Sequence, residues 1–360
     1  MTSLQIAQFR HARHYRNLLR GLNKLYKEGG LALNAGLDRF DLELANIQAA
    51  QAWAGSQADG NDEAAAVCSS FPRAGASLLS LRLPAAVRLQ WIERGLASAQ
   101  RLGQRQAESY HLMDLGLVYA ARGEIRRAVE FHEQALKIQR ELSDRLGESA
   151  TLGNLGNAYV RLKEPRRAIE FYEQVLAYYR ETGEQRGEAY ALNNLGVAYT
   201  DLDEFARAIE YLEQALTAQR NLGNTLGESD ALGNLGIAYK NLRQFERAAE
   251  YYKQQLHLAR EIHDRRGEAT ALSNLGRLSI EIADLARAVE LLQQAAALFR
   301  AAGDRRGEGN AFWSLSLAFE KLGDWEQARV CNETALQIRE AIQDPNLERT
   351  RQRAEQLKAK

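Results

Sequence analysis

The segment Leu152-Gly153-Asn154-Leu155-Gly156-Asn157-Ala158-Tyr159 decides the fold, because related segments recur every 40 residues. The related segments start at five other positions, which are Leu112, Leu192, Leu232, Leu272 and Phe312. A fixed period of this length is typical of stacked repeats, in which each unit covers its apolar face against its neighbours. The sequence therefore predicts an all-α fold, a right-handed α-solenoid of helix-turn-helix repeats.

Each repeat has the pattern of two antiparallel helices. In one unit these helices are predicted at about residues 145–162 and 164–182. Leu155 and Tyr159 are four residues apart and share one face of the first helix, which can pack against a neighbour. Gly156 removes a side chain where the second helix must approach closely. The repeat therefore contains the residues needed for its own packing.

The chain is expected to have four parts. Residues 4–27 and about 38–54 carry apolar residues at helical spacing, and Gly29-Gly30 is predicted to end the first of these helices. Residues 63–103 keep the register of the repeat but have lost its central motif. The predicted parts are an N-terminal helical cap or linker at 1–62, a degenerate repeat at 63–103, six 40-residue units at 104–342 and a C-terminal capping helix at 343–360.

Composition argues against several classes of partner. Lys plus Arg equals Asp plus Glu at 47 each, so no net field draws the chain to nucleic acid or to an anionic membrane. Cys68 and Cys331 are the only cysteines and form no disulfide or zinc framework. No secretory signal or membrane-spanning segment stands out. We expect a cytoplasmic protein without a metal or cofactor.

The repeat resembles the tetratricopeptide repeat at six signature positions. These are Leu155, Gly156, Tyr159, Ala168, Tyr172 and Leu176. The period exceeds the usual length of about 34 residues. In this respect, and in the phrase Asp-Arg-Arg-Gly-Glu-Ala at 264–269, the chain resembles the extended arrays of Pins-type polarity adaptors, kinesin light chains and bacterial signalling ATPases.

The front of the chain resembles one part of the bacterial STAND-type regulators. Residues 11–15 and 39–53 look like the segment that joins the nucleotide-binding and winged-helix portion of those proteins to their tetratricopeptide sensor. The sequence contains no Gly-x-x-x-x-Gly-Lys-Ser/Thr motif, which such an ATPase needs to hold phosphate. The resemblance therefore implies a sensor region without its motor.

The resemblance places the inner face of each first helix along a concave groove. A row of asparagines lies there, namely Asn154, Asn194, Asn234 and Asn274. An asparagine side chain can donate and accept at once, so this row could hold the main chain of an extended peptide. The alternative is that each asparagine bonds to the neighbouring repeat and holds the stack together.

Residues beside the asparagine row vary between repeats, as a selective surface requires. The predicted groove includes six of them, namely Asn157, Arg161, Tyr190, Asp230, Lys240 and Arg277. Their charges are mixed, and the Lys and Arg residues are not adjacent in the sequence. We therefore expect peptide binding, but no strongly basic groove of the kind that captures a terminal carboxylate.

A row of glutamates also repeats, at 148, 188, 228, 268 and 308. These residues fall in the first turn of each first helix. We expect them to complement the positive end of the helix dipole.

The predicted function is a non-catalytic module that binds a protein or peptide segment in its groove, as the ligand-sensing part of a bacterial signalling regulator. No Ser/His/Asp, Cys/His or paired-carboxylate arrangement stands out from the regular repeat. The alternative is a self-assembling or adaptor scaffold that links protein partners. We expect a monomer or a weak homo-oligomer. Light scattering over a range of protein concentrations distinguishes the binding module from the self-assembling scaffold, because a strict monomer excludes the scaffold.

Overall fold

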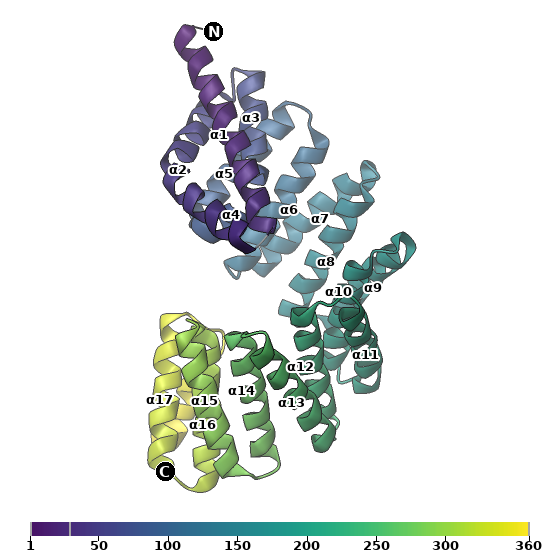
Figure 1. Ribbon diagram of the computed structural model, residues 1–360, viewed down its shortest axis with the longest axis vertical. Coiled ribbons are helices and arrows are strands. Elements are labelled where there is room, and N and C mark those ends of the chain that lie inside the picture. The colour runs from purple at the N-terminus through teal and green to yellow at the C-terminus, as the bar shows by residue number, and fades with distance from the viewer. Residues whose placement is uncertain (1, 29, 359–360) are drawn as a thin grey trace. The chain divides into compact units, whose positions relative to one another are not determined.

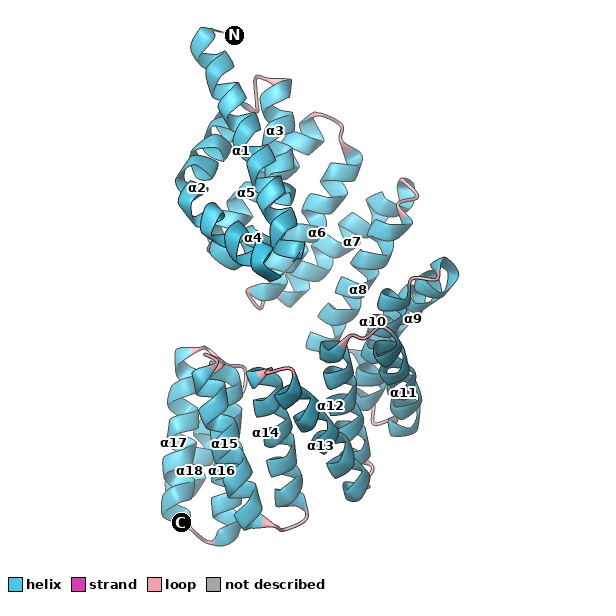
Figure 2. Cartoon of the chain, viewed as in Figure 1, coloured by secondary structure: helices cyan, strands magenta, loops and turns pink. Residues whose placement is uncertain are grey.

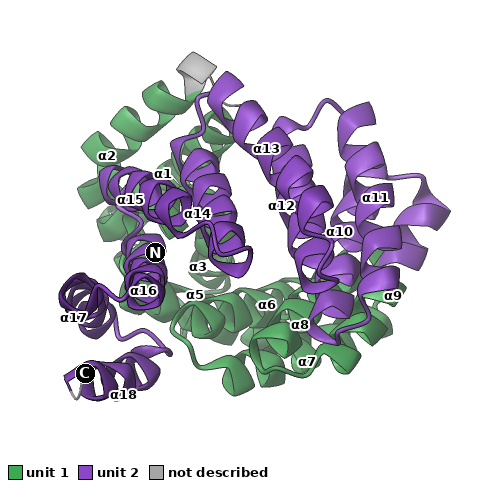
Figure 3. Ribbon diagram, turned by 90° about the horizontal axis from the view of Figure 1, so that it is seen from below, with its two compact units in different colours: residues 1–175 green, residues 176–360 purple. Residues whose placement is uncertain are grey.

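The computed structural model describes residues 2–28 and 30–358, and within them it contains helices and no strand (Figures 1 and 2). The chain forms two compact units, residues 1–175 and residues 176–360 (Figure 3). No helix in the described part of the chain is long and apolar enough to cross a membrane. The predicted all-α solenoid is confirmed. Gly29, one of the two predicted helix breakers, lies outside the described residues.

Six helix pairs follow the 40-residue period. We call the first helix of each pair the A helix and the second the B helix. The A helices are α6 (Arg105–Ala121), α8 (Arg145–Arg161), α10 (Gln185–Asp201), α12 (Thr225–Asn241), α14 (Arg265–Glu281) and α16 (Arg305–Leu322). The B helices are α7 (Ile125–Glu141), α9 (Pro165–Thr182), α11 (Phe205–Asn221), α13 (Phe245–Glu261), α15 (Leu285–Ala301) and α17 (Trp325–Ala341). Two helices per repeat were predicted, and this is confirmed.

Five helices precede these pairs and share one hydrophobic core. They are α1 (Ser3–Glu28), α2 (Gly30–Gln57), α3 (Asp62–Ala74), α4 (Ala76–Arg82) and α5 (Ala85–Arg101). Leu19, Phe40, Phe71 and Trp91 all lie in this core. The predicted start of the second helix near residue 38 is wrong, because α2 begins at Gly30 and includes Gly36. A Cβ added to Gly36 would lie only 3.3 Å from the backbone oxygen of Leu22, so the glycine allows α1 and α2 to pack closely.

A small residue in each A helix lets a large B-helix side chain approach, as predicted. In unit 2, a Cβ added to Gly236 would lie 2.3 Å from Cε1 of Tyr252, and one added to Gly276 would lie 2.6 Å from Cγ of Leu292. Both distances are too short for real carbon atoms. Tyr252 is fully buried in this position. The glycine therefore fixes how closely the two helices of a repeat pack.

The repeating glutamates form ion pairs between repeats, which the sequence analysis did not predict. The guanidinium of Arg220, at the end of α11, pairs with Glu228 of α12 at 2.7 Å, and Arg260 pairs with Glu268 at the same distance. Corresponding pairs join 140 to 148, 180 to 188 and 300 to 308. These pairs are difficult to predict from the sequence, because the two partners are eight residues apart and lie on successive helices, on either side of a turn.

The turns between helices carry left-handed backbone. Glycine occupies several of these positions, for example Gly303 with φ of 70° and Gly323 with φ of 80°. The turn between α14 and α15 instead has Ala283 at φ of 62°. A left-handed conformation costs a residue with a Cβ about 1–2 kcal/mol.

Replacing Ala283 by glycine is expected to stabilise unit 2. Relief of the left-handed strain exceeds the added backbone entropy of glycine, which costs roughly 0.5–1 kcal/mol, so the expected gain is about 0.5 kcal/mol. Thermal unfolding measures it. Ala302→Gly is the matched control, because Ala302 is also exposed at a helix end but has φ of −82°. This control is expected to lower stability, and a gain in both variants would contradict the explanation.

Candidate binding surface

Within unit 2, the A helices lie closer to one another than the B helices do. Every helix of the unit packs mainly on its neighbours in sequence, but successive members of the series α10, α12, α14 and α16 also contact one another, and no two B helices do so to the same extent. The A-helix side of unit 2 is therefore the inner side of the stack. The seven candidate residues of unit 2 all belong to the A helices α10, α12 and α14.

The ten predicted groove residues are divided between the two units. Asn154, Asn157 and Arg161 belong to unit 1, and the other seven belong to unit 2. In unit 1, the hydroxyl of Tyr172 donates to Oδ1 of Asn157 at 2.7 Å, and Arg161 donates to the backbone oxygen of Ala120 at 2.6 Å. These contacts join parts of unit 1, so Asn157 and Arg161 also take part in packing.

The asparagines of unit 2 have different environments. Nδ2 of Asn234 donates to Oδ1 of Asn193 at 3.0 Å, which ties α12 to α10. Nδ2 of Asn194 is buried and has no hydrogen-bond partner. Asn274 is 9% exposed and lines a hollow described below. Asn234 therefore matches the structural alternative, whereas Asn194 has a buried unpartnered nitrogen and Asn274 lines the hollow.

The variable residues of unit 2 lie on α10, α12 and α14. Tyr190 and Asp230 both have exposed surface. The carboxyl of Asp230 is nevertheless partly enclosed, and this partial burial together with the charge of Asp264 raises its pKa. Burial lowers the pKa of Lys240, and the positive charge of Arg277 lowers it further. Lys240 and Arg277 therefore lie close enough for their positive charges to interact, near the C-terminal end of unit 2.

A hollow of about 830 Å³ opens at that end. Its wall comes mainly from α14, α16, α17 and α18 (Leu347–Lys358), and Phe299 of α15 adds to it. Helix α18 packs against α17. Of the predicted residues, Asn274 and Arg277 line the hollow. Five arginines face this space, and we call it the arginine hollow; they are Arg266, Arg277, Arg306, Arg339 and Arg349. The expectation of a surface without concentrated positive charge is therefore wrong for unit 2.

Two of these arginines are neutralised by carboxylates from the next repeat. Arg266 pairs with Asp304 at 3.1 Å, and Arg306 pairs with Asp344 at 3.3 Å. Asp304 also accepts a hydrogen bond from the backbone N–H of Gly307, in the first turn of α16. The two pairs are related by the 40-residue period, so this part of the hollow could have been found from the sequence.

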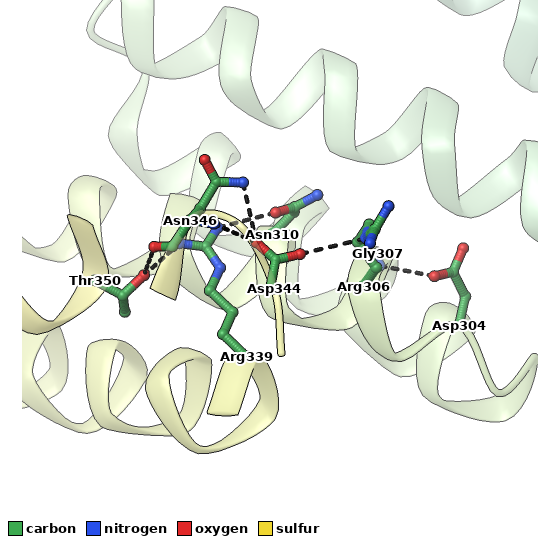
Figure 4. A network of polar contacts seen from close by, with 8 residues as sticks. All are labelled: Asp304, Arg306, Gly307, Asn310, Arg339, Asp344, Asn346 and Thr350. Atoms are coloured by element: carbon green, nitrogen blue, oxygen red, sulfur yellow. Dashed lines mark hydrogen bonds and ion pairs between the residues drawn. The ribbon is translucent and has the colours of Figure 1, made fainter. Parts of the chain in front are cut away.

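Arg339 has a different environment, because its hydrogen-bond partners are neutral (Figure 4). It is 4% exposed, donates from one terminal nitrogen to the hydroxyl of Thr350, and donates from the other to Oδ1 of Asn310 at 2.9 Å. Its Nε is buried and unpartnered. Burial lowers the pKa of Arg339, which the nearby Asp344 partly offsets. A buried guanidinium without a carboxylate partner is costly.

Trp313 organises the arginines from α17 and α18. The guanidinium carbons of Arg339, Arg349 and Arg353 lie 5.1, 5.4 and 5.2 Å from its ring centroid. Arg353 is held in addition by an ion pair with Glu320. Contacts of this kind stabilise a cation over an aromatic face. The repeat pattern gives no sign of this cluster, because Arg339, Arg349 and Arg353 lie on other helices than Trp313.

Other chemistry has less support in the described part of the chain. No group of three or more His, Cys, Asp or Glu residues there could hold a metal ion. Cys68 and Cys331 are both buried and unbonded to each other. The surface therefore offers hydrogen-bond donors, guanidinium groups and one aromatic ring.

These features define a class of protein, an α-helical repeat protein with a polar inner surface. The model of the family described as Tetratricopeptide repeat matches residues 105–181, 187–261, 228–301 and 267–341. The chain belongs to the tetratricopeptide repeat family, and the resemblance seen in the sequence is confirmed. No curated protein matches the chain.

Several solved structures share the fold at low identity. The apo form of RapI has a TM-score of 0.63 and 15% identity over 74% of this chain and 95% of that chain. A Rap protein complexed with Competence and Sporulation Factor has a TM-score of 0.59 and 15% identity over 94% and 96%. A Signal Transduction ATPase with Numerous Domains (STAND) with a tetratricopeptide repeat sensor, from Pyrococcus horikoshii, has a TM-score of 0.57 and 15% identity over 92% and 52%. At these identities the likeness concerns the fold.

Proposed function

We propose that the chain is a non-catalytic sensor module that binds a peptide segment on the A-helix side of unit 2. The arginine hollow carries this proposal. Its volume of about 830 Å³ lies within the range of roughly 300–1,000 Å³ that is usual for ligand sites. Polar donors from four helices converge on it, and Asn274 adds an amide that can bond to a peptide main chain.

We further propose that this module belongs to a bacterial signalling regulator. Two of the similar structures support this, because one is a STAND protein with a tetratricopeptide repeat sensor and the other is a Rap protein in complex with a factor. Mass spectrometry of the protein purified from its source tests whether the module is part of a STAND-type regulator. We expect to find peptides from outside the 360 residues, including a nucleotide-binding motif. A protein that contains no nucleotide-binding domain would exclude a STAND-type regulator.

Peptide binding itself is tested with a library. The full chain is immobilised and exposed to phage that display random nonapeptides, and we expect enrichment of related sequences. Asn274→Ala is expected to reduce this enrichment at least about tenfold, because loss of a hydrogen-bonding group in a binding site costs roughly 1–3 kcal/mol. The control is Asn221→Ala, which removes an exposed asparagine from the end of a B helix.

The control variant is expected to enrich the same sequences as the unmodified chain. Thermal unfolding of each variant shows whether it is folded. If a folded chain enriches no sequence family, peptide binding is excluded. If Asn221→Ala and Asn274→Ala reduce enrichment equally, the hollow is not the binding surface.

A further inference from the structure

The arginine hollow has more positive charge than its own carboxylates can neutralise. Glu281 and Asp304 line the hollow, and Asp344 forms an ion pair with Arg306, which also lines it. Asp304 and Asp344 are each engaged by one arginine. Within the described residues, Arg277, Arg339 and Arg349 form no ion pair with any carboxylate. Three guanidinium groups thus lack a carboxylate partner, and two of them, Arg277 and Arg349, are exposed to a ligand.

These three groups differ in accessibility in a way that suits a ligand. Arg277 and Arg349 are exposed, and they come from α14 and α18. Arg339 is buried at the wall of the hollow with its Nε unpartnered. A ligand carboxylate could therefore enter between the exposed arginines and reach the charge of the buried one.

The cluster around Trp313 holds the guanidinium groups in place. Arg339 and Arg349 both lie within 5.4 Å of the ring centroid, and Arg339 is fixed further by Asn310 and Thr350. Because these groups are ordered before a ligand arrives, less conformational entropy is lost on binding. Planar guanidinium groups match the geometry of carboxylates, which they bind through two parallel hydrogen bonds.

We propose that the arginine hollow binds an acidic peptide segment through the carboxylates of its Asp and Glu side chains. This inference rests on the proposed function and specifies its ligand. The hollow is much larger than one small anion needs. A nucleic acid is disfavoured, because it requires a basic surface that follows the phosphate backbone, and this chain has equal numbers of acidic and basic residues.

The test compares two matched pools of end-blocked nonapeptides. In the acidic pool every position is Gly, Ser, Asp or Glu, and in the neutral pool Asn and Gln replace Asp and Glu. The full chain is incubated with both pools, and bound peptides are counted by mass spectrometry. We expect the acidic pool to be retained at least about tenfold more, with the difference shrinking as salt rises from 50 to about 500 mM, because salt screens exposed charges.

Matched variants locate the site. Arg277→Gln and Arg349→Gln remove exposed charges and are expected to reduce retention of the acidic pool at least fivefold each. Arg247→Gln is the control, because it removes an exposed arginine from a B helix of the same unit. This control is expected to retain the pool unchanged. Equal losses in all three variants would overturn the assignment to the hollow.

Other outcomes separate this inference from the proposed function. Equal retention of both pools overturns the acidic ligand but leaves peptide binding intact. Complete displacement of the acidic pool by 1 mM inorganic phosphate overturns a peptide site in favour of a small-anion site. Stronger retention of a single-stranded oligonucleotide overturns it in favour of nucleic acid. Failure of the phage selection, with both pools also unbound, overturns the proposed function itself.

Discussion

Gly236→Val is expected to lower the free energy of unfolding of unit 2 by about 3 kcal/mol, near the upper end of the usual cost of overpacking a core. A Cβ at this position would lie 2.3 Å from Cε1 of Tyr252, which is 1% exposed and cannot move away into solvent. The two helices must therefore separate or the tyrosine must leave its preferred rotamer. Denaturant unfolding followed by tryptophan fluorescence and circular dichroism measures the loss.

Two controls test the cause. The first adds Tyr252→Ala to Gly236→Val, and the double variant is expected to be more stable than the sum of the two single effects predicts, because the new side chain enters the space left by the ring. The second is Gly21→Ala, since a Cβ there meets no atom within 4 Å; this change is expected to be neutral or slightly stabilising. Simple additivity in the double variant would refute the proposed clash.

The stability of unit 1 is expected to fall as the pH falls from about 6.5 to 4. His111 and His132 are fully buried, and burial lowers the pKa of each from 6.5 to about 4. Between these values the unfolded chain binds protons that the folded chain does not, so acid favours unfolding. Each pKa unit corresponds to about 1.4 kcal/mol, which gives roughly 3 kcal/mol for each histidine.

Asp114 opposes part of this effect. Burial raises the pKa of its carboxyl from 3.8 to about 6, so the folded chain binds this proton more readily and gains stability as the pH falls between those values. The opposing gain is also roughly 3 kcal/mol. With two histidines against one aspartate, we expect a net loss of about 3 kcal/mol between pH 6.5 and 4.

Replacing His132 by the residue that other repeats have at the same position tests whether buried histidines cause the acid sensitivity. Position 132 corresponds to Tyr172 and Tyr252 in other repeats, so His132→Tyr is expected to fold and to remove most of the net loss. The change His257→Tyr is the control, because His257 is exposed. Urea unfolding at pH 4.5, 5.5 and 6.5 measures the slope. An unchanged slope in His132→Tyr would show that acid acts on other groups.

Much of the arginine hollow is formed by contacts between helices, which the repeat pattern of the sequence does not show. The sequence singled out Asn274 and Arg277, and both line the arginine hollow. It missed Arg339 and Arg349, because these residues lie on different helices, α17 and α18, and outside the repeating motif. It also treated Asn194 and Asn234 alike, although only Asn234 finds a partner in the neighbouring A helix.

The period, the two helices of each repeat and the close approach of Gly236 to a B-helix residue can all be predicted from the amino-acid sequence. These features arise from short-range spacing, since residues three or four apart share a helix face and each repeat packs on the next in the same way. The pairing of charges, in contrast, depends on the folded arrangement of the helices. Arg266 and Arg306 meet carboxylates of the following repeat, whereas Arg339 meets neutral groups, because pairing depends on where separate helices place their side chains in space.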